Sequence, residues 1–158
     1  MPKILVHSEG SAEVALHDLG SEETAADLIG SVNGEVEEYA VWVGEEDAPV
    51  DPGTTLAALE GVTEGAEITV ARRGAIHVTV TFNGDRERDF RPQQKVRRVF
   101  EWAVGKDGFN IPADQRPEHE LAVAGHEEAA DPRAPVSFYA DAEREVTFIL
   151  RRKDGFQG

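Results

Sequence analysis

Residues 76–90 read IHVTVTFNGDRERDF, and this run carries the clearest structural signal in the chain. Hydrophobic and polar side chains alternate over residues 76–82, which is the two-residue period of a half-buried strand. Asn83 and Gly84 follow, and this dipeptide is typical of a tight hairpin turn because both residues tolerate positive φ. The run therefore predicts two antiparallel strands, the second over residues 86–90.

The residues after this hairpin predict a helix and two further strands. Pro92 suits the first turn of the helix. The apolar residues that follow have the i, i+3, i+4, i+7 spacing of one buried stripe: Val96, Val99, Phe100 and Ala103. The half is completed by a loop over residues 105–117, a strand over 120–123, a loop over 125–135, a short apolar connector over 136–139 and a strand over 144–150.

The first half of the chain repeats this order of elements. Residues 3–7 and 13–17 predict a hairpin with turn-forming residues between its strands. Ser21 is predicted to cap a helix, and Gly34 to end it in a left-handed conformation. The predicted buried stripe of this helix is Ala25, Leu28, Ile29 and Val32. Strands over residues 39–43 and 67–72 follow, with a short turn anchored by Leu56 and Leu59 between them, so the repeat is one of element order and spacing.

Charge divides the chain at the same place as this repeat. The 158 residues include 31 acidic and 16 basic side chains, a net charge of −15. Residues 1–73 hold 16 acidic and three basic residues, whereas residues 74–158 hold 15 and 13. We therefore predict two small domains, residues 1–73 and 76–153, followed by a flexible tail over residues 154–158. The joint, RRGA at residues 72–75, is too short for a flexible linker, so we expect restricted relative motion.

Composition excludes several classes of function. The acidity argues against a nucleic-acid partner, because binding a phosphate backbone needs a basic surface. The absence of cysteine excludes a disulfide framework, a thiolate zinc site, an iron–sulfur cluster and a catalytic thiol. No apolar run approaches the roughly 18 residues of a membrane span, and the apolar segment at residues 4–6 is too short for the core of a secretory signal. We therefore expect a cytoplasmic protein with no membrane partner.

The remaining polar clusters indicate no cofactor, no metal and no enzyme activity. The five histidines lack the spacing of a helical zinc motif, so surface positions are expected for them. The acidic residues at positions 35–38 and 45–47 lack the ligand spacing of a calcium loop and predict a solvated acidic face. Trp42 fits a domain core. Trp102 lies beside the buried stripe of its helix. Its side chain is therefore either partly buried in the core or exposed as an anchor for a partner or for the other domain.

The end of each half resembles the end of a ubiquitin-like β-grasp domain. Residues 55–74 read TLAALEGVTEGAEITVARRG: a short turn, a glycine turn, then a final strand running into basic residues and glycine. Residues 146–158, VTFILRRKDGFQG, end likewise. The resemblance implies an α+β fold of two consecutive ubiquitin-like domains, each a mixed sheet with one helix across it. Gly74 is interpreted as the joint between domains, because the chain continues directly into the next strand.

Two fused domains of this kind are similar to the interferon-induced tandem modifier of vertebrates and to the bacterial Bil-type proteins of antiphage conjugation operons. The resemblance implies attachment to target proteins through a C-terminal glycine, with an activating enzyme, a conjugating enzyme and a deconjugating protease as partners. Gly158 is the expected conjugation terminus, or Gly155 if a protease trims three residues. Arg151, Arg152 and Lys153 are expected to project from the strand end and bind the activating enzyme.

Two alternatives stay open. A non-conjugated adaptor would bind its partners through the same domains, and removing residues 156–158 would leave its activity intact. A sulfur carrier would instead convert its terminal glycine to a thiocarboxylate. The doubled architecture counts against the carrier, because such carriers are single domains that end in two glycines.

Overall fold

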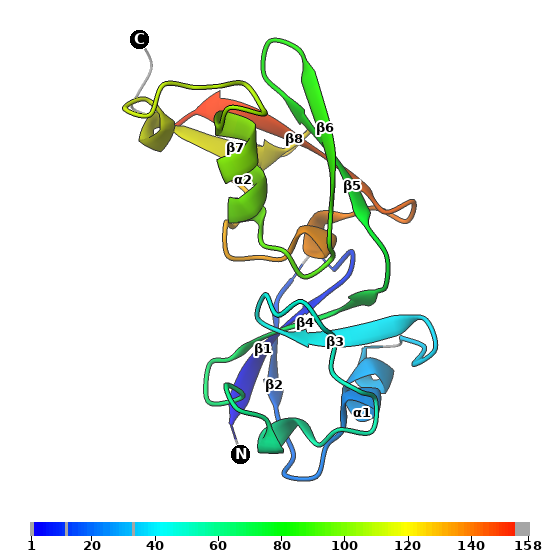
Figure 1. Ribbon diagram of the computed structural model, residues 1–158. Coiled ribbons are helices and arrows are strands. Elements are labelled where there is room, and N and C mark those ends of the chain that lie inside the picture. Colours follow the sequence, from blue (N-terminus) through cyan, green and yellow to red (C-terminus); the bar gives the residue numbers. More distant parts are fainter. Residues whose placement is uncertain (1, 12, 33, 154–158) are drawn as a thin grey trace.

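The computed structural model describes residues 2–11, 13–32 and 34–153, which form two β-sheet domains (Figure 1). The first contains β1 (Lys3–Ser8), β2 (Ala15–Asp18), α1 (Ala25–Ser31), β3 (Tyr39–Val43), the 3-10 helix η1 (Leu56–Ala58) and β4 (Glu67–Arg72). The second contains β5 (Ile76–Thr81), β6 (Asp85–Phe90), α2 (Val96–Val104), β7 (His119–Val123) and β8 (Glu145–Arg152), with 3-10 helices η2 (Arg116–Glu118) and η3 (Val136–Tyr139).

The two sheets have the same topology. Their strand orders are β2-β1-β4-β3 and β6-β5-β8-β7. In each sheet the two central strands are parallel and the outer strands pair antiparallel to them. The predicted α+β fold of two mixed sheets, each with a helix across it, is confirmed.

Each sheet has its own hydrophobic core beneath its helix. The first core includes Leu28 and Ile29 of α1 packed with Ile68 and Val70 of β4. The second includes Val96, Val99 and Ala103 of α2 with Val78, Val80 and Phe148, while Phe100 is partly buried against it. The predicted stripes therefore face their sheets, apart from Val32, which is only partly buried and is the C-cap of α1.

The starts of both helices differ from the prediction. Thr24, not Ser21, caps α1: its hydroxyl accepts from the Asp27 amide and the Asp27 carboxylate accepts from the Thr24 amide, a complete capping box. Pro92 lies before α2, which begins at Val96. Gly34 is also not in the left-handed region; it is required instead by space, because a Cβ there would lie 2.9 Å from Ile29 Cγ2.

The sheet face opposite α1 packs against the second domain. Trp42 is buried as expected, but it clusters with Ala40 and Ala71 on this face rather than with the residues beneath the helix. His7 lies on the same face, 3% exposed, with its ring edge-on to Phe138 of η3 at 5.2 Å. The Gly10 amide donates to the Ser137 carbonyl at 3.0 Å. The two domains therefore share an ordered interface beside their short joint.

Ion pairs across this interface join the acidic first domain to bases of the second. Glu67 pairs with Lys95 and, at 3.1 Å, with Arg133. Glu45 accepts from the Lys95 amide at 3.0 Å and pairs with two arginines of α2, and Asp47 pairs with Arg91 at 3.1 Å. The two helix arginines are Arg97 and Arg98, at 3.2 and 3.4 Å. The charge difference between the halves thus becomes an attraction between the domains.

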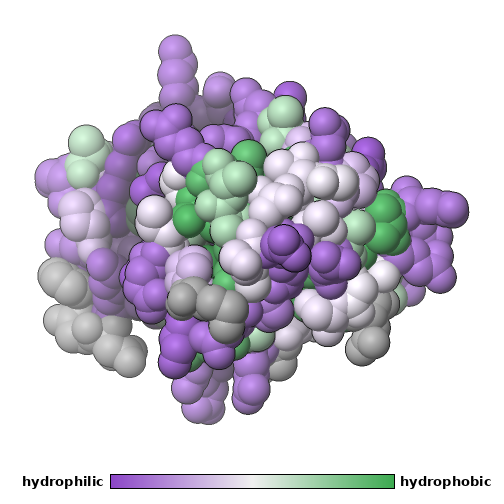
Figure 2. Space-filling view, turned by 90° about the horizontal axis from the view of Figure 1, so that it is seen from below, coloured by the Kyte–Doolittle hydropathy of each residue, from purple (hydrophilic) through white to green (hydrophobic). Residues whose placement is uncertain are grey.

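The surface of the molecule seen from below is mostly hydrophilic, with small separate hydrophobic patches (Figure 2). Among the described residues, the large apolar side chains that are well exposed are Val14, Leu16 and Val36. A hydrophilic exterior is what the high acidic content of residues 1–73 predicts.

The interface predicts that acid weakens the folded state through His7. Burial lowers the pKa of His7 below its ordinary value of 6.5, although Glu67 and Asp131 act in the opposite direction. The unfolded chain therefore binds this proton first as pH falls below about 6.5, and stability declines. The His7→Leu variant should lose less stability than wild type between pH 7 and pH 5 in urea unfolding. The His126→Leu variant, changed at an exposed histidine, should keep the wild-type slope, and equal slopes for all three would contradict the assignment.

Two interface carboxylates should add to this loss at lower pH. Burial alone would raise the pKa of Glu67, but the hydrogen bond from Lys95 and the charges of Lys95 and Arg133 outweigh it and lower the pKa. Burial alone would also raise the pKa of Glu45, but hydrogen bonds from Lys95, Arg97 and Arg98 outweigh it, and the pKa is lowered. Their contribution is present above the ordinary value of 4.5 and is lost as pH falls through the lowered pKa.

Candidate functional site

The end of β8 holds two of the three basic residues predicted to meet an activating enzyme. Arg151 and Arg152 lie within the strand, opposite Glu120 and His119 of β7. The strand predicted to end at residue 150 therefore extends to Arg152, two residues further. Pairing with β7 continues to this point, so the backbone of both arginines is held in the sheet at the end of β8.

Each of these arginines has a carboxylate partner in its own domain. Arg151 Nε donates to Glu120 Oε2 at 2.9 Å, and Arg152 pairs with Glu118 at 3.1 Å. Both pairs are partly exposed, so each contributes little to stability and can exchange its partner at low cost. A protein that docks here with acidic residues would compete with Glu118 and Glu120 for the two cations.

Lys153 is the last described residue, and its backbone is still tied to the domain. Its amide donates to the Glu118 carbonyl at 2.8 Å, while its side chain is exposed. This end of β8 points away from the first domain (Figure 1). The predicted conjugation termini, Gly158 and Gly155, lie outside the described residues.

An apolar hollow lies beside Lys153, and sequence reasoning did not anticipate it. It has a volume of about 290 Å³ between α2 and the edge strand β7. Its apolar lining comes chiefly from Val96, Phe100, Leu121, Ala130 and Pro132. Phe100 is partly buried and borders this hollow, and its predicted place in the buried stripe gave no signal of it.

The histidines occupy several environments, and the expectation that they lie on the surface is wrong for two of them. His7 is buried at the interface, and His119 is 6% exposed with Nδ1 2.9 Å from the Gln115 carbonyl. His17 and His77 contact carboxylates at the surface, and His126 is exposed. His7 and His17 are not opposite each other, because Ile4 pairs with His17. Over residues 2–11, 13–32 and 34–153, no three His, Asp or Glu side chains gather as a metal site.

Two mixed four-stranded sheets with the same topology, each covered by one helix, define a tandem ubiquitin-like protein. Residues 77–153 match the family model described as BilA ubiquitin-like domain 2. The second domain belongs to this family, and the first domain repeats its sheet topology. No curated protein matches the chain. None of the helices in the described part of the chain is both long and apolar enough to span a membrane.

Proposed function

We propose that this protein is a ubiquitin-like modifier that partner enzymes activate at a C-terminal glycine and join to target proteins, in the cytoplasm of a bacterium and in defence against phage. The observation that carries the proposal is the match of the second domain to BilA ubiquitin-like domain 2, within a chain that contains two such folds. The protein itself would supply no catalytic group. Its partners would be an activating enzyme, a conjugating enzyme, a deconjugating protease and the targets.

The chemistry requires a free terminal carboxylate that can enter an active site. The carboxylate attacks the α-phosphate of ATP to form an acyl adenylate, and pyrophosphate leaves. A cysteine thiolate of the partner then displaces AMP to give a thioester. Finally a target amine displaces the thiol to form an amide bond. Glycine suits these steps because it has no Cβ to obstruct a narrow channel or shield the carbonyl.

Residues at the end of β8 would position this terminus. Arg151, Arg152 and Lys153 offer three cations at the end of β8, where acidic residues of an activating enzyme could pair with them. The apolar hollow between Phe100 and Leu121 lies directly beside Lys153. A partner that fills this hollow would hold the chain where it leaves the domain.

In the decisive experiment the purified protein is incubated with ATP, Mg²⁺ and a candidate activating enzyme. We expect an adduct that disappears on treatment with a thiol, together with an intact mass that identifies the terminus used. The Gly158→Glu variant should lose the adduct almost completely, because the new side chain obstructs the reacting carboxylate. Gly53→Glu is the matched control, since Gly53 is exposed, has ordinary φ and has open space around the position of a Cβ.

The outcomes separate the candidate functions. An adduct that survives Gly158→Glu but is lost in Gly155→Glu would assign the mature end to Gly155 after trimming. An adduct that survives both changes would contradict activation at either glycine. Failure of wild type to form any adduct would favour the adaptor, whereas a stable thiocarboxylate on the recovered chain would favour the sulfur carrier.

A further inference from the structure

The imidazole of His119 lies on the side of β7 that faces α2. Leu121, two residues further along the strand, belongs to the core beneath that helix, and side chains two positions apart share one face of a strand. The side chain of His119 is almost completely buried, and its ring meets the Phe82 ring edge-on at 5.8 Å. The ring is therefore held at the margin of the core.

One nitrogen of this ring has a hydrogen-bond partner and the other has none. Nδ1 lies 2.9 Å from the Gln115 carbonyl oxygen, which can only accept, so Nδ1 carries the hydrogen and Nε2 of the neutral ring is an acceptor. Within the described part of the chain, no group donates to Nε2. The enclosed side-chain atoms without a partner there are Gln93 Oε1 and Arg144 Nε, so Nε2 can still be reached from outside. A donor from another molecule would satisfy it.

The hollow between α2 and β7 gives access to this ring. His119 borders it together with Phe100 and Leu121, and Lys153 borders it at the end of β8. Its volume of about 290 Å³ lies at the lower end of the range for ligand pockets. The hollow therefore has room for one large side chain, with apolar walls, an acceptor and a cation around it.

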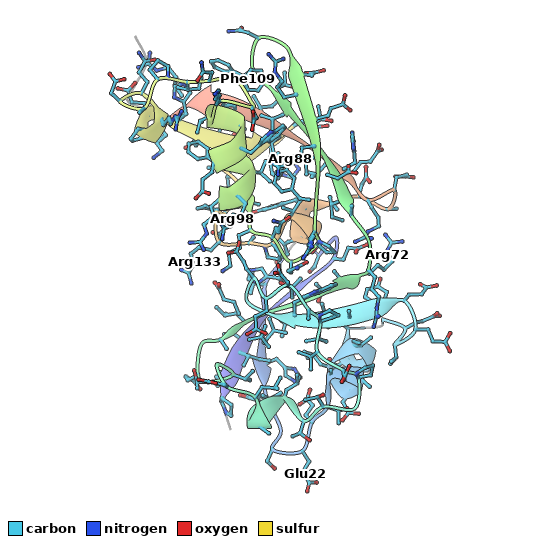
Figure 3. The ribbon with its side chains drawn as sticks, viewed as in Figure 1. Glu22, Arg72, Arg88, Arg98, Phe109 and Arg133 are labelled. Atoms are coloured by element: carbon cyan, nitrogen blue, oxygen red, sulfur yellow. The ribbon has the colours of Figure 1, made fainter. Side chains whose placement is uncertain are left out.

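Hydrogen bonds on two sides fix the walls of this hollow. The loop that follows β7 is tied to that strand, because the Ala130 amide donates to the Leu121 carbonyl at 2.8 Å. The same loop is tied to α2, because the Arg97 amide donates to the Pro132 carbonyl at 3.0 Å. Figure 3 shows Arg133 on this loop, below the start of the helix. The hollow is therefore formed before a partner arrives, and binding requires little ordering of the protein.

We propose that this hollow receives a tyrosine side chain of a partner protein, whose hydroxyl donates to His119 Nε2. The tyrosine ring packs against Phe100 and Leu121, which supply apolar walls. The phenol oxygen accepts from the Lys153 ammonium, which borders the same hollow. Tyrosine is favoured over tryptophan, whose indole N–H donates but cannot accept. It is favoured over phenylalanine because that ring would leave Nε2 covered and without a partner.

The identity of the partner rests on the proposed function, in which an activating enzyme holds the domain beside its C-terminus. A tyrosine seated beside Lys153 would fix the point where the chain leaves the domain. The contact itself requires neither ATP nor a free glycine. Failure to form an adduct with an enzyme therefore leaves peptide binding in place, and failure of a peptide to bind leaves the adduct experiment unaffected.

The test is a titration of the full chain with the tripeptide acetyl-Gly-Tyr-Gly-amide, followed through backbone amide shifts by NMR. The matched peptide carries phenylalanine in place of tyrosine. We expect the tyrosine peptide to shift the amides around the hollow with a dissociation constant of about 1–10 mM, and the phenylalanine peptide to bind about fivefold more weakly. In the His119→Phe variant, which keeps an aromatic ring but lacks the acceptor, this preference should disappear. The control His126→Phe, changed at an exposed histidine, should keep it.

Lys153 provides a second variant that does not alter a buried residue. Lys153→Met should weaken binding of the tyrosine peptide about threefold and leave the phenylalanine peptide unchanged, because only the phenol oxygen accepts from the exposed ammonium.

Four results would overturn the proposal. Wild type would bind the two peptides equally, or would bind neither up to about 10 mM. The preference for tyrosine would persist in a folded His119→Phe variant. Binding would be seen only after the change Phe156→Ala, which would assign the hollow to the chain's own C-terminal segment.

Discussion

The Glu9→Gln variant should lose about 3 kcal/mol of stability, because one buried carboxylate fastens the joint between the domains. Glu9 directly follows β1, beside the place where β1 pairs with β4, and its side chain is 5% exposed. It accepts from the Arg72 backbone amide at 3.0 Å and from Arg72 Nε at 2.6 Å, and it contacts Arg144 at 3.3 Å. Arg144 in turn donates to the carbonyl groups of Arg72 and Arg73. The carboxylate thus joins β1, the end of β4 and the turn before β8.

The expected loss of stability is large because the substitution leaves a buried arginine without its carboxylate partner. Burial lowers the pKa of the Arg144 guanidinium while the charge of Glu9 raises it, so the carboxylate offsets part of the cost of burying this cation. The hydrogen bond that Arg72 donates to the Glu9 carboxylate raises the pKa of Arg72. Removing one charge leaves Arg144 buried without its counter-ion, which is costlier than losing an exposed pair.

The comparison is made by urea unfolding of Glu9→Gln and of Glu60→Gln, a variant with the same charge change at an exposed residue. The control should stay within about 0.5 kcal/mol of wild type. Tryptophan fluorescence adds a local readout, since Trp42 lies on the sheet face that meets the second domain. A loss below about 1 kcal/mol for Glu9→Gln would assign this contact the value of an ordinary surface pair.

The Gly108→Ala variant should lose about 3 kcal/mol or more, because the loop after α2 leaves no room for a side chain. A Cβ at this position would lie 2.4 Å from the Ala103 carbonyl oxygen and 2.5 Å from that of Trp102. Both atoms belong to the last turn of α2, where they cannot move without breaking the helix end. The loop also supplies the Phe109 amide, which donates to the Ala103 carbonyl at 2.7 Å.

Gly53→Ala provides the matched control, because no atom lies within 4 Å of a Cβ placed there and its φ is ordinary. We expect that variant to be as stable as wild type or slightly more stable, since alanine reduces the entropy of the unfolded chain. Thermal unfolding distinguishes the two variants directly. Equal melting temperatures would mean that the loop moves away from α2 at little cost, contrary to the packing described above.

Much of the fold was predictable because its signals are local. The alternation over residues 76–82 and the Asn83-Gly84 turn predicted the second hairpin, and Asn83 and Gly84 do adopt positive φ, at 54° and 126°. The buried stripe of α2 followed from helical spacing alone. The capping box of Thr24 and Asp27 was also readable in the sequence and was missed in favour of Ser21. The first residue of α2 could not be predicted from the sequence, because Gln93 and Lys95, just before the helix, donate hydrogen bonds to Glu46 and Glu45 of the other domain.

The candidate site was predictable only in part. The basic residues at the end of β8 were identified from their position in the repeat, but the pairing of Arg151 and Arg152 with Glu120 and Glu118 depends on β7 lying beside β8. The hollow beside Lys153 depends on α2, β7 and the loop at residues 129–132 meeting in space.

Periodicity, turn chemistry and charge were enough to establish two repeated α+β units and an acidic first half, because each signal depends on residues within one turn or one strand. The packing of the domains decided the rest. It paired Glu9 with Arg144, buried His7 against Phe138 and left Arg86 and Arg88 on aromatic rings. The partners in the first two contacts are more than a hundred residues apart, and only the distances set by the folded chain decide which charges are neutralised.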